Sequence, residues 1–266
     1  MYFPSLSVLA VVSFGLVIGG VLFTLLSLLF PGIKGKPVVR SGMLLDTLYW
    51  YMSYVLYAPI TQWLIGGLVY LLGARLMLSH SATASVFSHF DLSMLPLIAQ
   101  LFIILLLTDL VQYVLHRFFH GRFLWKFHAI HHSSEEVDWL SAVRFHPLNL
   151  ITYSVVTGTL VALFSFDPLV YIMLVPFNMF YSSFTHANLS FTFGPLRYLF
   201  ASPVFHRWHH TRPKEGGERN FAPTFPFIDI LFGTFYMPKG MTPEHFGTTD
   251  PVPKTLLGQL IYPFRP

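Results

Sequence analysis

Residues 109–132 of the 266-residue chain read DLVQYVLHRFFHGRFLWKFHAIHH, which places five histidines directly after an apolar segment. A third histidine motif, HRWHH at residues 206–210, repeats the spacing of HAIHH at residues 128–132, 78 residues further along. The motifs at 116–120, 128–132 and 206–210 hold eight of the thirteen histidines of the chain. This concentration predicts that the rest of the chain holds a cluster of imidazoles in place.

The spacing of the histidines is that of one helix face. Residues three and four apart lie above one another on a helix, so each motif, if helical, directs two or three imidazoles to one side. Asp109 lies seven residues before His116, two turns back on the same stripe. A carboxylate there is expected to orient or supplement a ligand.

Many histidines crowded together indicate metal. Neutral imidazole is the commonest protein ligand for transition metals, whereas buried imidazoles without partners are costly and cationic ones repel each other. One metal takes about four to six ligands, so we expect two ions. Two single histidines flank an apolar hairpin that returns the chain to the cluster, and we expect them to complete the set. The candidate ligands, of which the first eight are also the candidate catalytic residues, are His116, His120, His128, His131, His132, His206, His209, His210, His146 and His186.

The three motifs resemble those of the fatty acid hydroxylase/sterol desaturase superfamily of integral membrane di-metal oxygenases. The short gap between His120 and His128 fits that superfamily, since the corresponding gap in acyl-CoA desaturases is much longer. The segments RFHP (144–147), THAN (185–188), NFAP (220–223) and FIDILFGT (227–234) are also similar to it. The resemblance covers roughly residues 95–240 and implies an O2-dependent lipid hydroxylase or desaturase. Asn188, Asn220 and Asp229 in these segments are expected to support the ligands. For Asn220 and Asp229 a role in a turn or a cap is the alternative.

The composition predicts an all-α, multi-span membrane protein. Apolar residues make up 54% of the chain and charged residues only 11%, against about 25% charged in typical globular chains. We expect spans at about 5–30, 47–73 and 92–115, the second one kinked at Pro59. The apolar segment 148–185 is broken at Asp167-Pro168, and it fits either two short crossings or a re-entrant hairpin. The N-terminus carries no cleavage motif typical of a signal peptide.

Basic residues indicate the orientation. They gather in the segments 31–40, 117–126 and 207–219 and are sparse at the N-terminus and in the loop 74–91. By the positive-inside rule, the histidine motifs and the C-terminus face the cytoplasm. The Pro- and Gly-rich segment after residue 211 is expected to form part of a cytoplasmic cap that holds the di-metal site. We divide the chain into N-terminal membrane helices (1–91), a catalytic region (92–240) and a C-terminal tail (241–266) within one structural unit.

Histidine sites poor in carboxylates suit iron, and less well zinc or copper. We therefore expect two irons, with zinc as a substitute in purified protein, and a lipid substrate that enters from the bilayer. The chain lacks haem, flavin and ferredoxin motifs, so its electrons are expected from a separate ferredoxin- or cytochrome-type protein. The formal charge of +4 fits a lipid surface better than nucleic acid, and no nucleic-acid partner is expected.

Several functions remain open at this point. Hydroxylation and desaturation begin with the same hydrogen abstraction, and the motifs do not separate them, although we favour hydroxylation. A zinc-dependent hydrolase needs a carboxylate base, for which Glu135 and Glu136 are candidates, but the surplus of histidines opposes it. A metal transporter usually places its ligands at mid-membrane depth, whereas most of these motifs lie at helix ends beside Arg and Lys.

Overall fold

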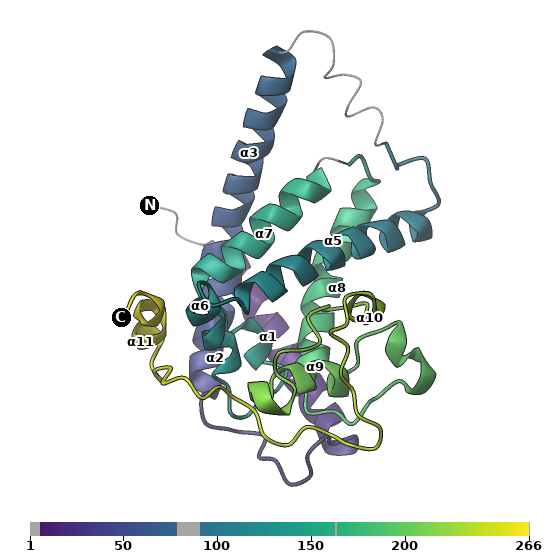
Figure 1. The fold of residues 1–266 in the computed structure, drawn as a ribbon. Helices are drawn as coiled ribbons and strands as arrows, with labels where there is room; N and C mark the ends of the chain where they lie inside the picture. Colours follow the sequence, from purple (N-terminus) through teal and green to yellow (C-terminus); the bar gives the residue numbers. More distant parts are fainter. Residues whose placement is uncertain (1–5, 79–90, 163, 266) are drawn as a thin grey trace.

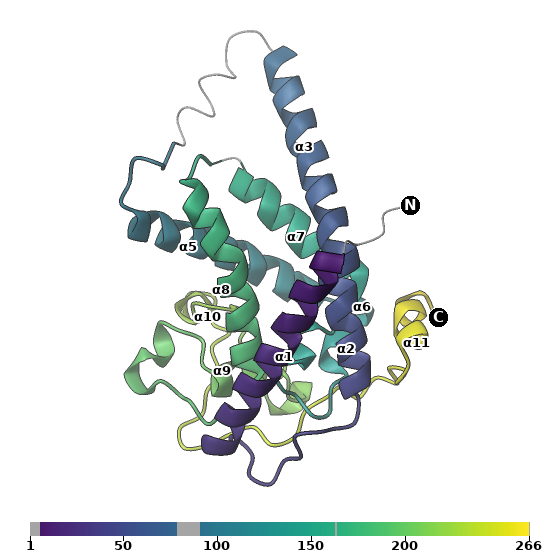
Figure 2. The same cartoon turned by 180° about the vertical axis from the view of Figure 1, so that it is seen from behind.

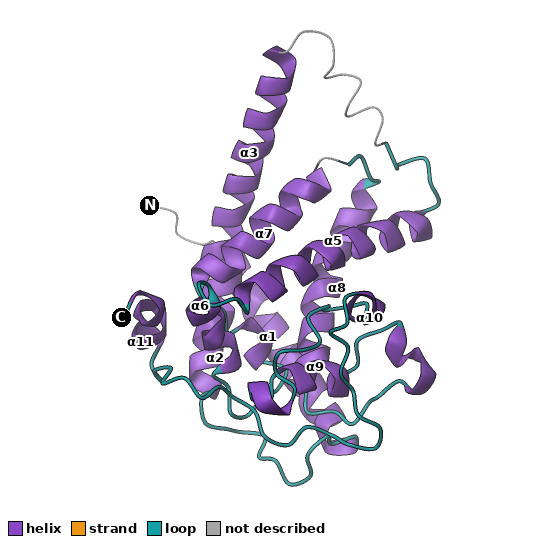
Figure 3. Ribbon diagram, in the orientation of Figure 1, coloured by secondary structure: helices purple, strands orange, loops and turns teal. Residues whose placement is uncertain are grey.

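The computed structural model describes residues 6–78, 91–162 and 164–265 of the chain. Within these residues the protein is helical: two isolated β-bridges occur, and no strand forms (Figures 1 and 3). The predicted all-α architecture is therefore confirmed. Most of the loop expected at 74–91 lies outside the described residues, and the helix before it continues to Leu78.

Three helical segments are long and apolar enough to cross a membrane, as the sequence predicts. They are α1 (Leu6–Leu29), the continuous segment Met43–Leu71, and α5 (Leu97–Phe119). The second segment passes through α2 (Met43–Tyr51), η1 (Met52–Tyr57) and the first part of α3 (Ala58–Leu78). Length and composition thus identify a membrane protein.

The disturbance expected at Pro59 takes the form of a π-helical turn. Pro59 cannot donate a backbone hydrogen bond. The turn before it, η1, is π-helical, and the N–H of Ala58 reaches back five residues to the carbonyl of Ser53. Such turns are rare and widen the helix locally. Ser53 and Tyr57 of η1 line a cavity that reaches the histidines.

The apolar hairpin consists of α7 (Pro147–Ala162) and α8 (Pro168–His186). Asp167 caps α8, because its carboxylate accepts a hydrogen bond from the N–H of Leu169 at 2.8 Å. The buried Gln100 of α5 accepts from the N–H of Asp167 at 2.8 Å, which ties the hairpin tip to α5. Helix α8 then returns the chain to the side from which α7 leaves, and it ends at His186 (Figure 2).

Short helices and loops form a cap beneath the long helices. Figure 1 shows α9 (Pro203–His209) and α10 (Phe227–Leu231) below α5, and α11 (Leu256–Ile261) beside α6 (Trp125–His132). The remaining short elements are η2 (Ser141–Val143), η3 (Gly194–Tyr198), η4 (Pro213–Glu215) and η5 (Tyr262–Phe264).

A buried ion network joins the cap to the first helices. Asp46 of α2 is fully buried and accepts hydrogen bonds from Arg40 at 2.6 Å and from Arg144 at 2.5 Å. Arg40 also binds Asp138 in a bidentate pair. Separation of the loop 31–42 from the segment 138–144 would leave a buried charge without its partner, which is costly. The network therefore holds these two segments together. Beside it, Trp139 packs against Phe23 of α1, with ring centroids 5.7 Å apart.

Candidate metal centre

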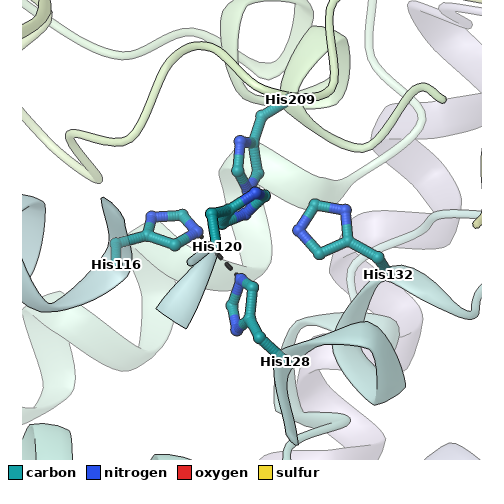
Figure 4. Close-up of side chains that lie close together, drawn as sticks. All are labelled: His116, His120, His128, His132 and His209. Atoms are coloured by element: carbon teal, nitrogen blue, oxygen red, sulfur yellow. Dashed lines mark hydrogen bonds between the residues drawn. The ribbon is translucent and has the colours of Figure 1, made fainter. Parts of the chain in front are cut away.

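Nine histidines converge into two adjacent groups, each able to hold a metal ion. In each group, one nitrogen per ring lies within 4.8 Å of those of the other members. We call the first the five-histidine group; Figure 4 shows its rings pointing toward one another. The second is the four-histidine group. The members are, respectively, His116, His120, His128, His132 and His209, and His131, His186, His206 and His210.

Helix geometry divides each motif between the two groups. Helix α6 contributes residues four apart, His128 and His132, to the five-histidine group, and His131 to the other. The motif at 206–210 does the reverse, because His206 and His210 enter the four-histidine group and His209 the five-histidine group. Neighbouring residues on a helix point about 100° apart, so adjacent histidines face different sites. The two groups are thereby held side by side by the same two helices.

Hydrogen bonds from Nδ1 to backbone carbonyls fix the orientation of three rings. The Nδ1 atoms of His116, His186 and His209 lie 2.8, 2.7 and 2.7 Å from the carbonyl oxygens of Phe221, Ser182 and Arg219. Carbonyl oxygens only accept, so each Nδ1 carries the proton and donates it. The Nε2 atoms of these rings then hold lone pairs and point into the cluster.

The Nε2 atoms of the four-histidine group lie close enough together to bind one cation. His186 Nε2 lies 3.2 Å from that of His131, and 3.1 Å from those of His206 and His210. His186 donates from Nδ1, so its Nε2 has no proton and directs a lone pair at the three other rings. In the five-histidine group, the buried Nε2 atoms of His120, His132 and His209 have no hydrogen-bond partner. The donor set therefore fits two metal ions.

Burial keeps the imidazoles outside the membrane spans neutral. Desolvation, followed by repulsion from neighbouring histidines, holds the pKa of His131, His132 and His210 well below the usual value of 6.5. The pKa values of His120, His128, His206 and His209 are lowered in the same way, again mainly by burial. Neutral imidazole is the form that binds metal, so burial prepares these rings as ligands.

Two buried carboxylates hold the loop 219–225 over the five-histidine group. Asp229 accepts hydrogen bonds from the N–H groups of Phe221 and Ala222 at 2.8 and 2.9 Å. Asp109 accepts from those of Thr224 and Phe225 at 2.8 and 2.9 Å. The loop in turn offers the carbonyls that orient His116 and His209. Both carboxylates thus act through the backbone and touch no histidine nitrogen.

The two asparagines predicted to support the site also bind backbone. Asn220 has a φ of 61°, which asparagine tolerates, and its amide pairs with the carbonyls of Phe205 and Tyr236. Asn188 pairs through its side chain with both backbone groups of Ile33. Asn220 therefore fixes the loop beside His209, whereas Asn188 fastens the end of α1 to the segment after α8.

The structure does not bring His146 to either group. Its Nδ1 accepts a hydrogen bond from the N–H of Leu148 at 3.1 Å, and its Nε2 donates to the carbonyl of Leu260 at 3.2 Å. Its ring packs between Phe127 and Phe264, with centroids 5.0 and 5.9 Å away. His146 thus anchors the C-terminal segment with both nitrogens occupied.

Asn149 is a site residue that the sequence reading missed. Its Oδ1 accepts the Nδ1 proton of His128 at 2.8 Å, and the residue is fully buried. The signal available was an amide side chain in the first turn of this helix, three residues after His146. That position could not be linked to His128 without knowing how α6 and α7 pack.

A cavity of about 490 Å³ approaches both histidine groups from the long helices. We call it the apolar cavity; it lies among η1, α3, α5, α7 and α8. Five histidines line its end, and apolar side chains such as Phe145, Leu150 and Met179 line its walls. Polar side chains stand one turn from the cluster, with Gln112 four residues before His116 and Ser182 four before His186. The cavity is large enough for part of a lipid-sized molecule beside the metal centre.

Comparisons with known proteins find a family model and several relatives similar to this chain. A family model described as "Fatty acid hydroxylase" matches residues 101–234. Ornithine lipid hydroxylase OlsE of Rhizobium tropici is 31% identical over 182 residues, which are 68% of this chain and 55% of that protein. Alkylglycerol monooxygenase of Homo sapiens is 34% identical over 129 residues, 48% of this chain and 28% of that protein. Methylsterol monooxygenase 1-1 of Arabidopsis thaliana is 24% identical over 143 residues, 52% of this chain and 47% of that protein. The chain spans about half of the length of these relatives or less, and no solved structure matches.

Proposed function

The chain belongs to the fatty acid hydroxylase family, which confirms the superfamily indicated by its motifs, and from that premise we propose that it is a membrane-embedded di-iron oxygenase. Its reaction is the hydroxylation of an unactivated C–H bond of a lipid, with O2 and an external electron donor. The observation that carries this proposal is the pair of adjacent all-histidine groups at the end of the apolar cavity.

In this proposal the five-histidine group holds one iron and the four-histidine group the other. Two irons bound there supply the capacity to activate O2 against a C–H bond, a task for which protein side chains alone have no chemistry. The residues of the chain bind the ions as neutral imidazoles, and His116, His128, His186 and His209 are held in the ligating tautomer by their Nδ1 partners.

The apolar cavity positions the substrate and keeps bulk water away from the reacting carbon. Its aliphatic and aromatic walls suit a hydrocarbon chain. The polar residues one turn from the histidines, Gln112 and Ser182, are placed to bind an oxygen or nitrogen of the lipid close to the carbon attacked. The substrates named for the relatives are an ornithine lipid, alkylglycerols and methylsterols, all of which combine a large apolar part with polar groups.

Two alternatives are less well supported. Desaturation would use the same groups, but the names of these relatives, hydroxylase and monooxygenase, favour insertion of oxygen. A zinc hydrolase needs a carboxylate beside the metal, and among the described residues neither histidine group includes Asp or Glu.

We place the histidine motifs and the C-terminus on the cytoplasmic side, with electrons supplied by a separate ferredoxin- or cytochrome-type protein. The basic segments 31–40, 117–126 and 207–219 support this orientation.

Metal analysis combined with turnover tests the function. Purified protein reconstituted with ferrous iron is expected to hold two irons per chain and to consume O2 only with a reductant and a lipid such as 1-O-hexadecylglycerol. Mass spectrometry should then detect a lipid product containing one atom from labelled O2. Turnover by zinc-loaded protein in the absence of oxygen would instead establish a hydrolase.

A further inference from the structure

A second cavity reaches the five-histidine group from the side of the cap. It measures about 320 Å³ and touches His120 and His132. We call it the polar cavity, because its lining contains no aliphatic side chain. The other lining residues are Arg122, Trp125, Thr211, Gly217, Glu218, Gly247, Thr248, Thr249 and Asp250.

The polar cavity and the apolar cavity share no lining residue. The apolar cavity touches His116, His128 and His131, together with His186 and His206, whereas the polar cavity touches His120 and His132. The histidine cluster thus contacts two separate spaces, and aliphatic side chains line only the apolar cavity. A lipid bound in the apolar cavity leaves the polar one open.

Contacts in the polar cavity fix polar groups next to the cluster. The ring of Trp125 lies 5.0 Å from that of His120 and 5.4 Å from that of His132, between centroids. Its Nε1 donates to Asp250 at 2.7 Å, and the hydroxyl of Thr248 donates to the same carboxylate oxygen at 2.7 Å. Asp250 is half-buried, while Glu218 and Arg122 are exposed. Polar groups therefore continue from solvent to two buried Nε2 atoms that have no partner.

Two positions in the lining of this cavity require glycine. Gly247 has a φ of 106°, which side-chain-bearing residues rarely adopt. A Cβ on Gly217 would lie 1.9 Å from the carbonyl oxygen of Thr211, so only glycine allows the two segments to approach this closely. The backbone itself thus forms the wall between solvent and the cluster at these points.

We propose that the polar cavity is the aqueous route to the metal centre, separate from the route of the lipid. This inference rests on the proposed function, a hydroxylation whose stoichiometry is R–H + O2 + 2e⁻ + 2H⁺ → R–OH + H2O. One oxygen atom enters the C–H bond, the other leaves as water, and the reductant supplies both electrons. Two protons must arrive and one water must leave while the lipid fills the apolar cavity. The polar cavity carries both, along Glu218, Asp250 and the threonine hydroxyls.

Single cysteines test the separation directly, because the chain contains no cysteine of its own. Thr248→Cys places a thiol in the polar cavity, and Thr157→Cys is the matched control, since Thr157 is equally half-buried but lines the apolar cavity. Metal-loaded protein in nanodiscs is treated with a trimethylammonium methanethiosulfonate, and mass spectrometry follows the labelling. We expect Thr248→Cys to react at least tenfold faster, at a rate unchanged by 1-O-hexadecylglycerol. Equal rates, or protection of Thr248→Cys by the lipid, would overturn the proposal.

The adduct then tests whether the route leads to the metal centre. Modified Thr248→Cys is expected to release its metal to a chelator at least tenfold more slowly than the unmodified variant. The same adduct on Thr242→Cys, an exposed position outside the polar cavity, should leave release unchanged. Release unaffected by the Thr248→Cys adduct would sink the proposal. Neither measurement needs turnover. If the protein oxidises no lipid, the proposed function is refuted, and the labelling and metal-release results still show whether the polar cavity leads to the metal centre.

Discussion

The Nε2 atoms of His116 and His128 face each other at 3.0 Å, although each ring already donates its proton from Nδ1. His116 donates to the carbonyl of Phe221 and His128 to the side-chain oxygen of Asn149. Neither Nε2 therefore has a proton to share, and the two lone pairs repel at this distance. A cation bound by both atoms turns this repulsion into attraction, which makes the pair a sensitive reporter of metal binding.

Replacement of Asn149 is expected to weaken metal binding without removing a ligand. Asn149→Leu deletes the oxygen that holds His128 in its ligating tautomer. The loss of such a partner typically lowers metal affinity by about 10- to 100-fold. Asn149→Asp keeps an acceptor at the same position and should retain most of the affinity. Competition with a calibrated chelator measures both variants, and equal losses in the two would show that Asn149 acts only by packing.

Single histidine replacements should separate the two ions. His209→Ala removes a member of the five-histidine group and His131→Ala a member of the four-histidine group, so each is expected to lower the metal content from about two ions per chain toward one. His146→Ala is the control, because His146 belongs to neither group. Plasma mass spectrometry of purified protein gives the content. Loss of an ion in His146→Ala would restore this residue to the ligand set.

The helical spacing of the motifs predicts that the histidines converge, and the same geometry accounts for how neighbouring ones divide between the two groups. From His128, a helix turns through about 300° to His131 and about 400° to His132, so these two neighbours diverge by about 100°. The division between the two histidine groups follows from this angle. What the sequence could not supply is the approach of α9 from 78 residues away, which gives each divergent ring its partners.

His146 and Asn149 show where sequence reasoning failed and why. Both lie at the start of α7, and the pattern favoured the histidine as a ligand. The outcome depends on tertiary contacts: His146 faces the carbonyl of Leu260, 114 residues away, and Asn149 faces His128. Long-range packing of this kind leaves no local periodicity in the sequence. By contrast, the membrane spans were predictable, because hydrocarbon thickness alone sets their length.

Loss of Asp229 should destabilise the loop over the five-histidine group. Asp229→Ala leaves the N–H groups of Phe221 and Ala222 buried without acceptors, at a cost of about 1–3 kcal/mol each. We expect a lower midpoint of thermal unfolding and weaker metal retention, since the loop offers the carbonyl that orients His116. Asp91→Ala is the control, because Asp91 is exposed and, among the described residues, its side chain accepts from Ser93 alone. Similar midpoints of thermal unfolding for the two variants would show that Asp229 does not stabilise the loop.

Lys36 predicts a pH dependence of stability. Burial, aided by the nearby Arg207, lowers the pKa of Lys36 to about 8 from an ordinary value of 10.5. Between these two values the unfolded chain binds a proton that the folded chain does not, so Lys36 makes the free energy of unfolding rise with pH in that window. Below pH 8 the folded chain bears the full cost of the buried charge.

Lys36→Met should therefore have a higher free energy of unfolding than the natural chain at pH 7. Loss of the hydrogen bond that Lys36 donates to the carbonyl of Val137 at 3.1 Å reduces this gain. The advantage is expected to shrink as pH rises from 8 toward 10.5, because the natural side chain becomes neutral in the folded state. Lys34→Met is the matched control two residues away, at an exposed position. Unfolding midpoints of the natural chain, Lys36→Met and Lys34→Met at pH 7, 9 and 10 test this pH dependence. A difference between Lys36→Met and the natural chain that stays constant with pH would show that the ammonium group is solvated in the folded protein.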